Sequence, residues 1–155
     1  LGKSYNGNVL QIREVSSDGP MSRKDTFHKL KLIVYKPQQE AIDTMAELEQ
    51  VREIVQQLLE NYAAYTDDEQ NIDTELILDT VRDHYQLVHV GWLNERRVYG
   101  CILHLDIKDG KVWLQHNGTE NDIAAELVDM GIAKTDIVIG FHSPFKRQFT
   151  EYAVS

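Results

Sequence analysis

The dipeptide Asp109-Gly110 is the feature of this sequence that most constrains its fold. Apolar and polar residues alternate on both sides of it, which is typical of strands with one buried face. A two-residue type I′ turn favours this dipeptide, because both of its central residues need a positive φ. The turn therefore predicts an antiparallel hairpin with a fixed register. The expected pairs on its apolar face are Ile107 with Val112, Leu105 with Leu114, and Leu103 with His116.

Two helices and further strands are predicted around this hairpin. Apolar residues recur every three or four positions in Met45–Tyr65, which predicts an amphipathic helix. A second helix is expected between an N-cap at Thr119 and Gly131. Strands are expected over residues 74–81, 85–92, 97–107 and 136–141. These elements predict an α+β fold, in which an antiparallel meander of about four strands and a short C-terminal strand pack with two α-helices.

Residues 1–44 differ from the rest of the chain and are predicted to be an N-terminal extension of a domain at 45–155. Residues 1–26 are rich in Gly, Ser, Asn and Asp, so we expect little regular structure there. Alternation in "KLKLIVY", followed by a turn at "KPQQ", predicts a short hairpin over about 29–42.

Charge argues against direct DNA binding by the domain. The 155-residue chain has a net charge of −9, and residues 45–155 carry nine Lys and Arg against twenty Asp and Glu. Such a surface repels phosphate, whereas DNA binding needs many cation–phosphate contacts. The single cysteine, Cys101, excludes an internal disulfide and suits a reducing cytoplasm. The sequence shows no pattern of a signal peptide or a membrane span.

The sequence contains candidate residues for metal binding and for catalysis, but the predicted strand register does not bring them together. His104 and Asp106 should share one face of their strand, and His116 and His142 are possible further ligands. The register from the Asp-Gly turn places His116 on the face opposite His104, which predicts no metal site. Cys101 lies inside a strand, where a buried small apolar residue is expected rather than a nucleophile. We therefore expect no catalytic, cofactor-binding or metal-binding residue.

One polar turn gathers the first group of candidate interaction residues. Arg82, Asp83, His84 and Tyr85 follow one another between two predicted strands. Their charges could perform acid–base chemistry, or they could form an Asp–Arg network that fixes a hairpin, which is the interpretation we favour. Trp92, near the end of the next strand, is a further candidate for contact with a partner.

The C-terminal stretch "FHSPFKRQFTEYAVS" holds the second group of candidates. His142 precedes Pro144, which should end the last strand. One helical turn after this proline would put Phe145 and Phe149 on one side, where we expect both to pack on the sheet. Lys146 and Arg147 should then point outward and form part of a docking surface for a partner or a second copy.

Several segments in this order resemble the XisI family, the fdxN-element excision controlling factors of cyanobacteria. The resemblance covers residues 45–155 and is carried by "DTVRDHYQ", "VGW", "RRVYG", "DIKDGKVWLQHNGTE" and "FHSPFKRQFTE". It implies an accessory role, with a companion called XisH, in the excision of a DNA element by a separate recombinase. Residues 27–42 are similar to the C-terminal end of XisH, which suggests that the extension is an XisH-like remnant. They carry no carboxylate–lysine core of a nuclease.

The function expected from the sequence is that of a non-enzymatic accessory factor. It would act by contact with an XisH-like partner of nuclease fold, in the cytoplasm and as a homo-oligomer. Direct DNA binding is the first alternative, and it would use cations such as Arg96, Arg97, Lys146 and Arg147. A metal-dependent hydrolase built on His104, Asp106 and His142 is the second. Salt-dependent DNA binding would favour the first alternative, and bound metal would favour the second.

Overall fold

The computed structural model describes the backbone of residues 23–64 and 71–155, and the side chains of residues 39–64 and 71–155. The chain divides into two compact units, Leu1–Glu40 and Ala41–Ser155. In the first unit, residues 23–40 are helical. The expectation of little regular structure in residues 1–26 falls mainly outside the described residues. None of the helices that the structure describes is long and apolar enough to cross a membrane.

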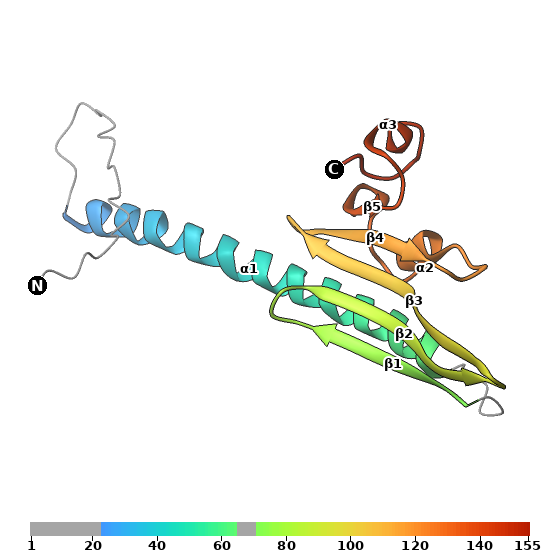
Figure 1. Cartoon of the computed structure of the whole chain (residues 1–155). Helices are drawn as coiled ribbons and strands as arrows, with labels where there is room; N and C mark the ends of the chain where they lie inside the picture. Colours follow the sequence, from blue (N-terminus) through green and yellow to red (C-terminus); the bar gives the residue numbers. More distant parts are fainter. Residues whose placement is uncertain (1–22, 65–70) are drawn as a thin grey trace, which may run out of the picture. The chain divides into compact units, whose positions relative to one another are not determined.

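A five-stranded sheet forms the centre of the second unit (Figure 1). Its strands lie in the order of the sequence and have these bounds: β1 Ile72–Asp79, β2 His84–Leu93, β3 Arg96–Lys108, β4 Lys111–Asn117 and β5 Ile137–Ile139. The first four strands pair antiparallel, and β5 pairs parallel to β4. The predicted α+β fold with a meander and a short C-terminal strand is therefore confirmed.

The hydrophobic core lies on one face of this sheet. Side chains from α1 (Arg23–Ala64) and α2 (Ile123–Asp129) pack there against alternate residues of the strands. The central buried side chains are Val55, Leu58, Leu59, Leu103, Leu105, Leu114, Ile123 and Leu127. Burial of each large aliphatic side chain contributes about 1.5–3 kcal/mol to folding, so this cluster fixes which strand residues face inward.

The turn between β3 and β4 has the predicted conformation, but the register beyond it changes. Asp109 and Gly110 have φ values of 53° and 74°. The pairs of Ile107 with Val112 and of Leu105 with Leu114 are confirmed. The expected pair of Leu103 with His116 is wrong, because a bulge leaves Gln115 without a counterpart in the ladder, so that His116 pairs with His104. The prediction that His116 lies on the face opposite His104 is therefore also wrong, because paired residues share a face.

The first helix differs most from the sequence prediction. It begins at Arg23 rather than at Met45, and the hairpin predicted over 29–42 is wrong because these residues belong to α1. Apolar residues in "LKLIV" fit both a strand and a helix, and such a short run does not distinguish the two. The following Gln, Glu and Ala residues favour a helix, which continues through Pro37 despite the lost N–H group.

The later elements begin and end close to the predicted positions. Asp122, rather than Thr119, caps α2, and its side chain accepts a hydrogen bond from the Ala125 amide at 3.1 Å. Gly131 follows the C-cap of α2 with a φ of 111°, as expected for this position. A one-turn helix, α3 (Pro144–Arg147), follows β5. The polar turn and α3 thus come from opposite ends of the sheet's strand order.

Candidate functional site

The turn between β1 and β2 is fixed by its own acidic side chains. Asp79 accepts hydrogen bonds from the backbone amides of Val81 and Arg82 at 3.0 and 2.9 Å. The Arg82 guanidinium also bonds to the Asp79 carboxylate at 3.1 Å. Hydrogen bonds from the Arg82 backbone and side chain hold the pKa of Asp79 below its usual range. Arg82 itself is exposed and belongs to a local network that fixes the turn.

Asp83 connects this turn to α1. Its two carboxylate oxygens accept hydrogen bonds from Arg52 at 2.7 and 2.8 Å, and the Tyr85 hydroxyl donates to it at 3.0 Å. The bond with Arg52 lowers the pKa of Asp83 despite partial burial. Burial, and then the Asp83 carboxylate, raise the pKa of Tyr85 to about 12. The structural interpretation of the turn therefore fits, but its main arginine is Arg52 from the helix.

His84, the next residue, joins a different cluster around Asp106. The Asp106 side chain lies mid-strand and is only 3% exposed. Its Oδ1 atom lies 2.6 Å from Nδ1 of His84 and 3.1 Å from Nε2 of His104. Its Oδ2 atom lies 2.6 Å from the Lys108 ammonium and 2.8 Å from the Gln115 amide nitrogen.

This cluster stabilises a buried negative charge. Burial alone would raise the pKa of Asp106, but hydrogen bonds from Lys108, His84 and Gln115 outweigh it and hold the pKa well below its usual range. A buried carboxylate without such partners would cost several kcal/mol. The cluster lies on the sheet face away from the core, because its strand residues alternate with the core residues Tyr85 and Leu105.

The sequence correctly paired His104 with Asp106 but missed His84 as their neighbour. Of the four candidate ligands, His116 and His142 do not belong to the group whose ligand atoms lie within 4.8 Å of one another. His84 takes their place, because it pairs with Asp106 across β2 and β3. A ladder without a bulge, continued from the pair of Leu93 with Arg96, would place His84 opposite Leu105. A bulge at Ile102 shifts that register by one residue, and period-two alternation contains no signal for it.

Arg147 fixes the C-terminal segment. Arg147 belongs to the short helix α3, which Ser143 caps. Its guanidinium lies 5.0 Å from the centre of the Trp113 ring. The guanidinium donates to the backbone carbonyl oxygens of Ile139, Gly140, His142 and Val154 at 3.0 to 3.3 Å. One side chain thus connects the end of β5, the turn that follows and the end of the chain.

Phe145 and Phe149 are exposed, contrary to the prediction that they pack on the sheet. They are 71% and 74% exposed, and their rings contact each other edge to face with centroids 5.2 Å apart. The two rings do lie on the same side of α3, but this side faces solvent. Arg147, which was expected to point outward, faces the sheet instead. The reason is the row of backbone carbonyl groups at the end of β5, which the guanidinium satisfies and a phenyl ring could not. Lys146 is exposed, as expected.

His142 and Trp92 occupy separate positions. The Nδ1 atom of His142 is buried and has no hydrogen-bond partner among the described residues. Burial, and then the charges of Lys146 and Arg147, lower the pKa of His142. Trp92 is half exposed in β2, where the Arg97 guanidinium lies 5.6 Å from its ring centre and 5.9 Å from that of Tyr99.

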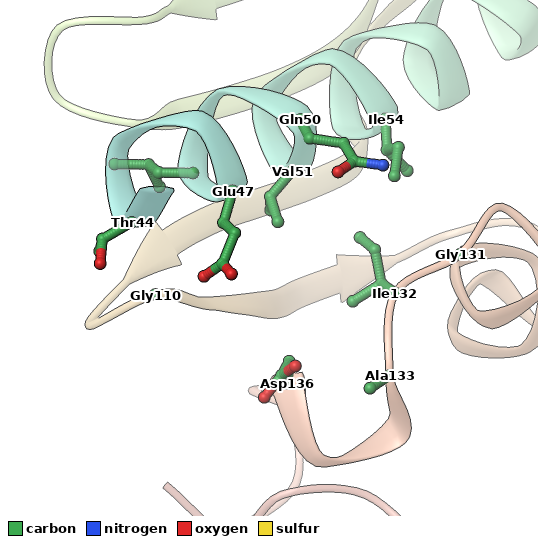
Figure 2. A pocket seen from close by; sticks show the side chains of 11 residues that line it. Thr44, Glu47, Gln50, Val51, Ile54, Gly110, Gly131, Ile132, Ala133 and Asp136 are labelled. Carbon is green, nitrogen blue, oxygen red and sulfur yellow. The ribbon is translucent and has the colours of Figure 1, made fainter. Parts of the chain in front are cut away.

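A pocket of about 420 Å³ lies between α1 and the segment after α2. Figure 2 shows the Val51 side chain pointing from the helix toward Ile132, with Glu47 and Asp136 beside them. No cationic side chain lines this pocket among the residues that the structure describes there. The sequence did not predict it, because its walls come from segments about 80 positions apart.

Comparison with known proteins identifies the family. The family model of the XisI protein matches residues 45–154. The crystal structure of a XisI-like protein from Anabaena variabilis ATCC 29413 is 49% identical, with a TM-score of 0.67, over 70% of this chain and 99% of that chain. That of the fdxN element excision controlling factor XisI from the same organism is 34% identical, with a TM-score of 0.62 and the same coverage. No curated protein matches the chain. The chain therefore belongs to the XisI family.

Proposed function

We propose that this protein is a non-enzymatic accessory factor in the excision of a DNA element, and that it acts by binding an XisH-like partner protein. Family membership supports the accessory role, since a relative 34% identical to this chain is described as an fdxN element excision controlling factor. A controlling factor need not perform the chemistry of strand exchange. If it acts by binding a partner, it needs a surface that the partner recognises.

The exposed ring pair of Phe145 and Phe149 is the observation that carries this proposal. Large aromatic side chains that remain exposed on a well-fixed segment are typical of binding hot spots. Arg147 holds the segment through four backbone carbonyl groups, so a partner meets a preformed surface. Preformed surfaces lose little conformational entropy on binding. We name this surface, formed by Phe145, Lys146 and Phe149, the α3 surface.

Charge favours a protein partner over bare DNA. The family domain carries a net charge of −11, as counted over residues 45–155. An acidic surface attracts a basic protein and repels phosphate. A nuclease-like protein needs a basic surface to bind the phosphates of DNA, and such a surface would attract this acidic domain. The acidic domain could therefore steer association while the two phenyl rings supply the contact area.

Co-purification of untagged protein with an affinity-tagged XisH-like protein tests this proposal. We expect the wild type to be retained in samples treated with a non-specific nuclease, which removes DNA bridges. The double variant Phe145→Ala, Phe149→Ala should be lost from the complex and keep its melting temperature, because both rings are exposed. Tyr99→Ala is a matched control, since this aromatic residue is 75% exposed but lies in β3.

Three other outcomes would contradict the proposal. Retention of the double variant would show that the α3 surface does not carry binding. Loss of the wild type after nuclease treatment would show that DNA bridges the two proteins. Self-association that depends on the two rings, measured by light scattering in the absence of the partner, would assign this surface to a second copy of the chain instead.

A further inference from the structure

We propose that His84, His104 and Asp106 bind a divalent transition-metal cation of the zinc class. This site is independent of the α3 surface, and the two can be tested separately. Three potential ligand atoms, one from each side chain, lie within 4.8 Å of one another. They come from adjacent positions of two paired strands, so the backbone ladder holds them in place.

Two of the three distances between the ligand atoms can be compared with those of a metal site, and the third, between the two imidazole nitrogens, is at most 4.8 Å. Oδ1 of Asp106 lies 2.6 Å from Nδ1 of His84 and 3.1 Å from Nε2 of His104. In a tetrahedral zinc site with bonds of about 2.0–2.1 Å, the ligand atoms are about 3.3 Å apart. The contact of His104 therefore needs almost no change. The contact of His84 needs to widen by about 0.7 Å, which its half-exposed imidazole permits.

The Asp106 carboxylate is oriented as a ligand that uses one oxygen. Lys108 and Gln115 both bind Oδ2, at 2.6 and 2.8 Å, and leave Oδ1 facing the imidazoles. Metal-binding carboxylates are commonly held by such hydrogen bonds to their second oxygen. The ammonium group of Lys108 also lies on the oxygen away from the two imidazoles, which separates it from the cation position.

The two imidazoles that converge on Oδ1 of Asp106 can either donate hydrogen bonds to it or share a cation with it. A neutral imidazole has one N–H group, so two donors to Oδ1 require the Nδ1–H form of His84 and the Nε2–H form of His104 at once. A bound cation would instead take the lone pairs of the same two ring nitrogens, which requires the opposite forms, Nε2–H for His84 and Nδ1–H for His104. Imidazole and carboxylate together suit zinc and its transition-metal neighbours better than magnesium.

The site is also accessible. The side chains of His84 and His104 are 48% and 29% exposed, so an ion can approach the two imidazoles from solvent, beside the buried Asp106 carboxylate. Three protein ligands leave at least one coordination position open. Water, or a side chain of a partner protein, would fill that position.

Isothermal titration of untagged, chelator-treated protein with zinc chloride tests the proposal, and magnesium chloride serves as the ion control. We expect one zinc ion per chain and no saturable binding of magnesium. His84→Gln and His104→Ala should each weaken zinc binding at least tenfold. Gln can still donate a hydrogen bond to Asp106 but is a poor zinc ligand, so His84→Gln separates coordination from hydrogen bonding. His89→Ala, in the same strand as His84, is the matched control and should bind like the wild type.

Circular dichroism confirms that each variant is folded before titration. Absence of one-per-chain zinc binding in the wild type would overturn the proposal. Unchanged binding in both His84→Gln and His104→Ala would also overturn it, as would an equal loss in His89→Ala. Asp106 would in those cases be a hydrogen-bonded structural carboxylate.

Discussion

Arg147 shows how one residue determines the role of its neighbours. Because its guanidinium takes the inward position in α3, the two phenyl rings face solvent. Sequence spacing places Phe145 and Phe149 on one side of a helical turn, but it does not decide which side is buried. The carbonyl groups that decide it belong to the end of β5, to the turn that follows it and to the end of the chain.

Removal of this guanidinium should destabilise the protein. Arg147→Ala removes a donor from four backbone carbonyl groups, although that of Ile139 keeps the His142 amide, and we expect a loss of about 1–3 kcal/mol in the free energy of unfolding. Urea denaturation measures this difference. Lys146→Ala, at the adjacent exposed position, should change the value by less than about 0.5 kcal/mol. Equal values for the two variants would show that Arg147 does not fix the segment.

Acid should weaken the link between the first turn and α1. The bond with Arg52 lowers the pKa of Asp83 in the folded state, whereas an unfolded Asp has a pKa of about 3.9. A lowered carboxyl pKa contributes stability that is complete above the unfolded pKa and is lost as the pH falls through the folded pKa. We therefore expect Asp83→Asn to lower stability at pH 7 and to flatten its decline below about pH 4.

Asparagine suits this test because Asp83 has a φ of 58°, which asparagine also tolerates. The free energy of unfolding is measured in urea from pH 7 down to pH 3 for both proteins. Parallel curves for the wild type and Asp83→Asn would refute the assigned contribution of this carboxylate.

At the scale of elements, the sequence predicted the sheet well because its turns and alternation are local. Asp109-Gly110 fixed the hairpin and its first pairs. The bulges at Ile102 and Gln115 were not predictable, because they depend on how the sheet twists and packs. The two bulges determine the cross-strand partners of His84 and His104, so the cluster around Asp106 could not be derived from alternation alone.

The hairpin turn can be tested with two glycines. An added Cβ meets no atom within 4 Å at either Gly110 or Gly100, but only Gly110 has a positive φ, of 74°. Gly110→Ala should therefore cost about 1 kcal/mol through backbone strain alone. Gly100→Ala, inside β3, should leave stability unchanged or slightly raised. Thermal denaturation compares the two, and equal melting temperatures would argue against the strain at the turn.

The first helix illustrates the limit of local pattern. Residues 29–42 contain an apolar run that fits either type of element, and a proline that usually ends helices. Neither feature excludes the helix found there. In contrast, the stripe from Leu48 to Tyr62 extends over four helical turns, and its side chains pack on the core as predicted.

At the scale of the whole molecule, we propose that residues 1–44 are an extension that the family domain does not need for folding. The family model begins at residue 45, and the described core side chains of α1 begin at Leu48. A chain lacking residues 1–44 should unfold in one cooperative transition, as measured by calorimetry. Loss of that transition would show that the extension contributes to the core.

The affinity of the chain for an XisH-like protein tests the central proposal most directly. Isothermal titration without DNA should give a saturable one-to-one complex. We expect the dissociation constant to rise at least tenfold in the variant Phe145→Ala, Phe149→Ala, which corresponds to about 1.4 kcal/mol. Tyr99→Ala should bind like the wild type. A wild-type affinity that is undetectable, or that the double substitution leaves unchanged, would contradict an accessory function exerted through the α3 surface.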